Sequence, residues 1–187
     1  GILMKKLGMI LLMAVFLSAC GNVSPSKSLV VYYSNNDEIE ALATQIAKDS
    51  DSELFQIVPK KDYSSLNEKI ENDEELSVSE IEDLQSTNVL LEQSVPDQWS
   101  ECDTVYIGFP VQSITAAPAP VSVFLSQNNL KNKTFIPFTI GTQDALDHAK
   151  DSLTFDGARK GWESGKAFSP TYTDTEVKEW VETVNQQ

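Results

Sequence analysis

Apolar residues follow two different spacings along the chain, and the two spacings alternate. Uninterrupted apolar runs at residues 29–33 and 104–109 are rich in β-branched and aromatic side chains. Such runs are typical of strands that are buried on both faces of a parallel sheet. Residues 53–58 and 133–139 predict two further strands.

Between these runs, apolar residues recur at intervals of three and four, which is the spacing of an amphipathic helix. The first such segment carries Ile39, Leu42, Ala43, Ile46 and Ala47, and later segments lie at residues 121–126, 144–153 and 175–184. Strands and helices that alternate in this way predict βαβ units, a central parallel sheet and helices on both of its faces.

A polar and acidic stretch from Glu68 to Asp83 separates the second predicted strand from the third. Apolar residues within and next to it are Ile70, Leu76, Ile81 and Leu84. This spacing predicts short helices with one apolar face, and the acidic side chains form their solvated side.

The beginning of the chain has the pattern of a leader peptide. Lys5 and Lys6 precede an apolar run at residues 7–16, and Leu-Ser-Ala-Cys follows, ending at Cys20. The run is too short for a permanent transmembrane helix, which needs about 20 apolar residues. The box before Cys20 resembles the bacterial lipoprotein signal, in which the cysteine is acylated and becomes the new N-terminus. A plain secreted protein is the alternative.

This pattern divides the chain into a signal peptide at residues 1–19, a lipidated Cys20 with a tether at residues 20–28, and one domain at residues 29–187. We therefore expect an extracytoplasmic protein whose membrane partner is reached through the lipid on Cys20, since two or three acyl chains give stable anchoring. Any redox or protein partner is left open by the sequence.

Charge and cysteine content narrow the classes of partner further. The chain has a net charge of −14, and loss of the leader removes two lysines and no acid. Such a charge argues against nucleic acid and anionic lipid as direct partners. Cys102 is the only other cysteine, so lipidation of Cys20 leaves no pair for an intramolecular disulfide.

The order of strands and helices resembles the flavodoxin family, in particular its flavodoxin-like lipoproteins. The stretches that carry the resemblance are LVVYYSNNDEIEALATQIA, ELFQIVPKKDY, DTVYIGFPV, FLSQNNLKNKTFIPFTIGT and EVKEWVETV. The resemblance implies an α/β three-layer sandwich with a five-stranded parallel sheet of order 2-1-3-4-5. It also implies FMN as the cofactor, bound at the carboxyl ends of strands 1 and 3.

The first FMN loop implied by the resemblance would hold the phosphate, and its residues here are Ser34, Asn35, Asn36, Asp37, Glu38 and Ile39. The family pattern is Ser-x-Thr-Gly-Asn-Thr, so Asp37 stands at the glycine and Glu38 at the asparagine. Carboxylates at a helix N-terminus oppose the binding of a phosphate dianion. As an alternative interpretation, Asp37 and Glu40 form a capping box that satisfies the first amides of the helix, worth about 1 kcal/mol.

The second and third implied loops retain part of the family pattern. Their residues are Gly108, Phe109, Pro110, Val111 and Gln112, and then Thr139, Ile140, Gly141 and Thr142. The second loop lacks the aromatic residue that the family usually places against the flavin ring. Aromatic stacking contributes about 0.5–1.5 kcal/mol beyond the burial of area, so its loss weakens the case for tight binding.

Other catalytic chemistry has little support. His148 is the only histidine, and its place four residues after Asp144 predicts a surface position on a helix. No histidine or cysteine pair has metal-ligand spacing, and no phosphate-binding or nucleophile motif is present. Cys102 precedes a predicted strand, where a thiol behaves as a small apolar side chain.

Two classes of function remain. In the first, the protein is a surface redox module that binds FMN weakly and passes electrons; a flavin-dependent quinone reductase is a less favoured variant of it. In the second, it is a flavin-free binding lipoprotein whose crevice takes an uncharged or cationic ligand. Asp37, Glu38 and the missing aromatic favour the second class, whereas the retained glycines and hydroxyls favour the first. No catalytic residue and no metal ligand is predicted.

Overall fold

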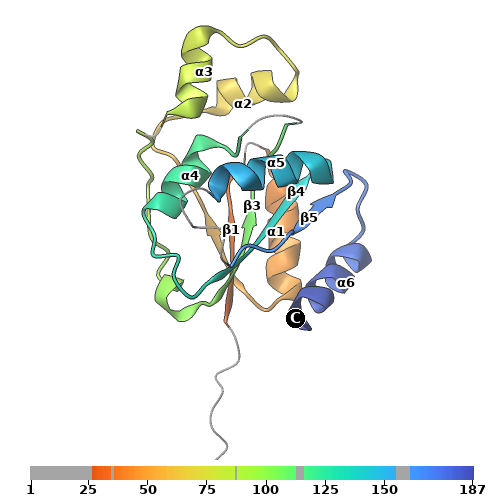
Figure 1. Ribbon diagram of the computed structural model, residues 1–187. Helices are drawn as coiled ribbons and strands as arrows, with labels where there is room; N and C mark the ends of the chain where they lie inside the picture. Colours follow the sequence, from red (N-terminus) through yellow and green to blue (C-terminus); the bar gives the residue numbers. More distant parts are fainter. Residues whose placement is uncertain (1–26, 35, 87, 113–115, 155–160) are drawn as a thin grey trace, which may run out of the picture.

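Five parallel strands form the centre of the protein (Figure 1). The computed structural model describes residues 27–34, 36–86, 88–112, 116–154 and 161–187. The strands are β1 (Ser28–Tyr32), β2 (Glu53–Gln56), β3 (Thr104–Gly108), β4 (Thr134–Ile140) and β5 (Lys166–Phe168). Their order in the sheet is β2-β1-β3-β4-β5, and every neighbouring pair is parallel. The predicted sheet order is therefore confirmed.

The central strands owe their position to their continuous apolar sequence. Val30 and Val31 of β1 point to opposite faces of the sheet, and neither is exposed to solvent. The apolar pattern had located four of the five strands, and it missed β5. That strand has three residues and lies at the edge of the sheet, so it lacks a long apolar run.

In the described part of the chain, two helices cover each face of the sheet. These helices are α1 (Asp37–Asp49) and α6 (Asp174–Asn185) on one face, and α4 (Ala119–Ser126) and α5 (Gln143–Leu153) on the other. Each pair shields its own apolar core, so the sheet separates two clusters of buried residues. All four predicted helical segments are confirmed, and α4 begins two residues before the predicted boundary.

Two short helices, α2 (Ser64–Glu71) and α3 (Val78–Gln85), form a hairpin in the crossover from β2 to β3. They confirm the short helices predicted for the acidic stretch. Figure 1 shows the hairpin beyond the carboxyl ends of the strands. Salt bridges of 2.7 Å stabilise it, from Lys69 to Glu80 and from Lys61 to Asp83. A short 3-10 turn, η1 (Trp99–Glu101), precedes β3.

Within the described residues, no helix combines the length and the apolar character that crossing a membrane requires. The predicted leader, Cys20 and most of the predicted tether lie outside the described residues. The first described strand, β1, begins at Ser28.

Candidate functional site

The first loop closes on itself through hydrogen bonds of Ser34 and Asn36. The Ser34 hydroxyl accepts from the Asn36 amide at 3.1 Å and donates to the Asn36 carbonyl. The Asn36 side-chain oxygen then accepts from the amides of Glu38 and Ile39, at 3.0 and 3.5 Å. Asn36 is thus the N-cap of α1, with the extended backbone that this position requires. Asn35 lies outside the described residues.

The predicted capping box of Asp37 and Glu40 is wrong. The helix begins at Asp37, one residue earlier than that box requires, because the Asn36 amide oxygen already reaches the first amides. Asp37 and Glu38 are exposed in the first turn, where negative charge interacts favourably with the helix dipole. Ile39 packs in the core between the sheet and α1 and α6, so no polar group replaces the threonine of the family pattern.

Gly108, at the end of β3, is required by packing. A Cβ atom at this position would lie 2.2 Å from two ring carbons of Phe138 on the neighbouring strand. Phe109 follows and is fully buried in the core on the α4 and α5 face. The retained Gly-Phe pair is therefore explained by the fold, whatever the crevice binds.

The rest of the second loop contacts the α2–α3 hairpin. The Gln112 side-chain amide donates to the carbonyl of Ile70, near the end of α2, at 2.8 Å. Val111 and Ile70 both pack at the margin of the same core cluster, and Pro110 is half-buried. The hairpin is thereby attached to a loop that the sequence assigned to flavin binding.

The third loop is joined to the second by a buried hydrogen bond. The Thr139 hydroxyl donates to the Phe109 carbonyl at 2.7 Å, and Thr139 has no exposed surface. Gly141 has a φ of +154°, which side chains with a Cβ rarely adopt, and a Cβ there would lie 3.3 Å from Val111. Half-buried Ile140 packs against the core on the α1 and α6 face, and Thr142 caps α5 through the Ala145 amide at 3.3 Å.

All three predicted loops therefore lie at the carboxyl ends of the neighbouring strands β1, β3 and β4. Backbone hydrogen bonds continue past the strand ends, from Tyr33 to the Gly108 carbonyl at 2.9 Å and from Phe109 to the Phe138 carbonyl at 3.3 Å. In the sheet, β1 lies between β2 and β3. The chain therefore moves to one side of β1 to form β2 and to the other side to form β3. Ligands in open α/β sheets bind at such a reversal of strand order.

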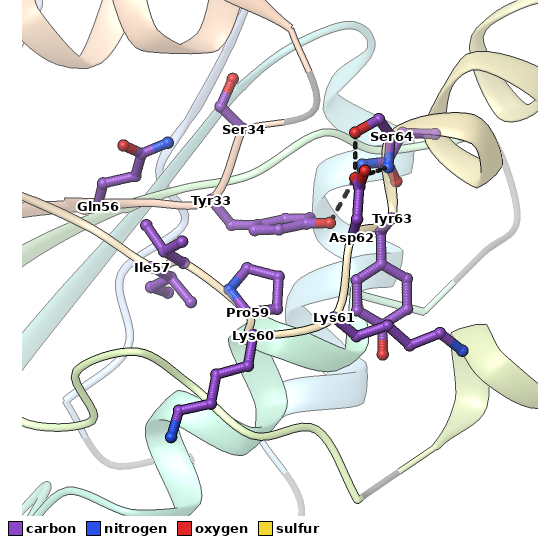
Figure 2. Close-up of a pocket in the computed structure, with 12 residues that line it drawn as sticks. Tyr33, Ser34, Gln56, Ile57, Pro59, Lys60, Lys61, Asp62, Tyr63 and Ser64 are labelled. Atoms are coloured by element: carbon purple, nitrogen blue, oxygen red, sulfur yellow. Dashed lines mark hydrogen bonds between the residues drawn. The ribbon is translucent and has the colours of Figure 1, made fainter.

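A cleft of about 290 Å³ lies on the opposite flank of the first loop, at the ends of β1 and β2 (Figure 2). Its lining residues are Tyr33, Ser34, Gln56, Ile57, Val58, Pro59, Lys60, Lys61, Asp62, Tyr63, Ser64 and Asn67. Of these described residues, only Ser34 was assigned to a site by the sequence. Adjacent lysines in a strongly acidic chain are the signal that could have indicated this cleft.

Other reactive groups are placed as the sequence predicted. Cys102 is buried, its thiol donates to the Trp99 carbonyl at 3.3 Å, and burial raises the pKa of the thiol. His148 is exposed on α5. No group of three or more histidine, cysteine or acidic side chains in the described part of the chain could hold a metal ion.

The comparisons with known proteins identify the family. The family model described as flavodoxin matches residues 27–184, and the chain belongs to this family. A candidate flavoprotein from Bacteroides uniformis has a TM-score of 0.70 at 24% identity, over 84% of this chain and 98% of that one.

Two further solved structures share the fold. A candidate flavoprotein from Bacteroides eggerthii has a TM-score of 0.69 at 20% identity, over 85% of this chain and 98% of that one. A flavoprotein from Lactobacillus acidophilus in complex with FMN has a TM-score of 0.50 at 22% identity, over 83% and 98% of the two chains. No curated protein matches the sequence.

Proposed function

We propose that this flavodoxin-family protein is an electron-transfer module that binds FMN weakly at the three loops following β1, β3 and β4. The observation that carries the proposal is the meeting of these loops at the reversal of strand order. Family membership and the related flavoprotein in complex with FMN support it. When bound, FMN supplies the redox chemistry.

The backbone of the three loops suits FMN, whereas the side chains of these loops fit it only in part. Ser34 and the first amides of α1 would hold the phosphate, and the second and third loops would border the ring. The Asn36 oxygen now occupies two of those amides, so it has to move before a phosphate can replace it. Asp37 and Glu38 add two negative charges beside the same helix end. The affinity is therefore expected to be low.

The second candidate is a flavin-free binding lipoprotein with the same fold. The specific observation that favours it is the satisfied N-terminus of α1, where Asn36 performs the role of a bound anion. In this case the crevice accepts an uncharged or cationic ligand, because Asp37 and Glu38 repel anions from it.

FMN titration of the full-length protein in nonionic detergent, followed by quenching of flavin fluorescence, separates the two candidates. We expect Asp37→Gly with Glu38→Asn to strengthen FMN binding by roughly threefold to thirtyfold, at about 0.3–1 kcal/mol per charge. Riboflavin lacks the phosphate, so its affinity should be the same for the variant and for the unaltered protein. Glu179→Gln with Glu182→Gln is the matched control, because both acids are exposed on α6. If neither the unaltered protein nor the first variant binds FMN, the flavin proposal is wrong.

We also propose that a lipid on Cys20 holds the domain at the outer face of a membrane. The chain enters β1 at the amino edge of the sheet, opposite the three loops. The seven residues from Gly21 to Lys27 extend at most about 3.6 Å each, so the membrane would face the amino edge and leave the crevice accessible. Labelling with radioactive palmitate tests this proposal. The unaltered protein should incorporate the label, and Cys20→Ala should not. Labelling of Cys20→Ala, or no labelling of the unaltered protein, contradicts the proposal.

A further inference from the structure

Two salt bridges determine which side of α3 is turned toward the rest of the protein. Glu80 pairs with Lys69 of α2 at 2.7 Å, and its other carboxylate oxygen accepts from the Ser77 amide, also at 2.7 Å. Asp83, three residues further along, pairs with Lys61 at 2.7 Å. Residues three apart share one face of a helix. This face of α3 is therefore the one that attaches it.

The attached face of α3 makes one apolar contact. Leu84 is half-buried and packs at the margin of the core cluster on the α4 and α5 face. With 3.6 residues in each turn, Glu80, Asp83 and Leu84 lie within about 100° of one another around the helix axis. Side chains of charged residues thus provide most of the attachment of α3.

The opposite face of α3 points outward, and its residues are Val78, Ile81, Glu82 and Gln85. All four are exposed, with 74% of Val78 and 42% of Ile81 accessible to solvent. An amphipathic helix usually turns its apolar face toward the core. In α3, two neighbouring apolar side chains instead lie on the outward face, and the helix buries no residue. The outward face is therefore an apolar surface without a partner within the helix hairpin.

Acidic side chains border this outward face. Glu82 lies on it, and Glu74 and Glu75 come just before the helix; all three are exposed. Lys69 is the one basic residue between Ser64 and Ser86 in the sequence, and its charge is already paired with Glu80. The outward face thus combines an apolar centre with a negative border.

We propose that the outward face of α3 is a docking surface for a protein that presents an apolar patch bordered by lysine or arginine. Charge complementarity selects this partner, because opposite charges at the border favour encounter and like charges oppose it. A second copy of the chain carries the same acids and a net charge of −14, so it is disfavoured. Anionic lipid is disfavoured for the same reason, and the hairpin lies at the end of the molecule opposite to the start of β1 (Figure 1).

The hairpin connects this docking surface to the crevice. The Gln112 side chain of the second loop donates to the Ile70 carbonyl of α2 at 2.8 Å, and α2 is joined to α3 through the Lys69–Glu80 pair. A protein docked on α3 would therefore lie on the second-loop side of the crevice. The proposal goes beyond FMN binding and does not depend on it.

An NMR titration of the full-length, ¹⁵N-labelled protein in nonionic detergent tests the proposal. The probe is the hexapeptide Lys-Leu-Lys-Lys-Leu-Lys, acetylated and amidated at its ends. In one control peptide serine replaces both leucines, and in another glutamate replaces all lysines. We expect saturable amide shifts centred on residues 78–85 with the probe, roughly tenfold weaker binding of the serine peptide, and no binding of the glutamate peptide.

Three results of this titration would overturn the proposal. Equal affinity for the probe and the serine peptide would mean that charge alone drives binding. Shifts that are absent, do not saturate or spread over all acidic surfaces would mean that α3 is not a docking surface. Shifts of residues 78–85 that depend on protein concentration without any peptide would assign the surface to a second copy. Because no FMN is present, none of these results bears on the proposed flavin function.

Val78→Ala with Ile81→Ala should weaken binding of the probe by roughly threefold to thirtyfold, since it removes apolar area from the outward face. The helix should persist, because alanine has the highest helix propensity, and circular dichroism checks this. Leu54→Ala with Val95→Ala is the matched control, since these apolar side chains lie outside the hairpin and are 39% and 48% exposed. Equal weakening by both pairs overturns the assignment to α3.

A second pair of variants tests the charged border. Glu82→Gln should weaken binding of the probe by roughly twofold to fivefold, as expected for an exposed ion pair. Glu179→Gln removes an equally exposed acid from α6 and should leave the affinity unchanged. Equal effects of the two variants would mean that the probe responds only to net charge, which contradicts docking at α3.

Discussion

Replacing Gly108 by alanine should destabilise the protein even though the change adds only one methyl group. The added Cβ would lie 2.2 Å from two ring carbons of Phe138. The ring is fully buried between the sheet and α1 and α6, so it has no open space into which it can move. Overpacking of this kind costs about 1–3 kcal/mol. For a domain of this size, each kcal/mol lowers the Tm by roughly 2–4 °C.

Urea denaturation followed by tryptophan fluorescence measures the cost, and Phe138→Leu provides the matched background. Removing the ring should make Gly108→Ala less costly in that background than in the unaltered protein, so the two changes couple favourably. The reasoning is refuted if Gly108→Ala is as stable as the unaltered protein, or if the two changes are additive. Either result would mean that packing does not require Gly108. Flavin binding would then be the remaining explanation for a glycine at this position.

Three further predictions concern hydrogen bonds and ionisation. Thr139→Val should lower the free energy of unfolding, measured by urea denaturation, by about 1–3 kcal/mol, because it leaves the buried Phe109 carbonyl unpaired. Thr139→Ser keeps the hydroxyl and should lose less stability. Equal losses in the two variants would contradict the role of this hydrogen bond. Lys69 and neighbouring donors lower the pKa of Glu80 from 4.5 to about 2. The Glu80 carboxylate therefore stabilises the hairpin above pH 4.5, and this effect is lost as the pH falls through about 2. Glu80→Gln should reduce the helicity measured by circular dichroism at pH 7 but not below pH 2. Burial raises the pKa of Tyr106 to about 12, so titration by absorbance at alkaline pH should include a tyrosine that ionises only near pH 12, and the loss of that step in Tyr106→Phe assigns it to Tyr106.

The sequence predicted those elements whose apolar pattern is long enough to be read locally. Residues 29–33 and 104–109 form buried strands, and α1, α4, α5 and α6 lie where the spacing of apolar residues placed them. β5 escaped detection because three residues cannot establish a period. The position of the α2–α3 hairpin was also beyond the sequence, since α3 buries no residue and nothing local indicates where it packs.

The candidate site was predicted in outline but not in detail. The resemblance placed three loops at one edge of the sheet, and the structure has them there. Asp37 and Asn36 are both good N-caps, so their sequence cannot decide between them; the backbone turn held by Ser34 decides for Asn36. The cleft beside β2 depends on the pairing of residues 58–60 with residues 90–92, which lie far apart in the sequence.

The two outermost strands of the sheet are unusually short, with four residues in β2 and three in β5. An open strand edge is a template for pairing with another molecule, and a short edge offers few consecutive hydrogen-bonding groups. Past β2, the chain is already bridged in antiparallel fashion at Pro59 and Leu91, and proline has no amide hydrogen to donate. The two edges of the sheet therefore offer little backbone for a second copy of the folded protein to pair with.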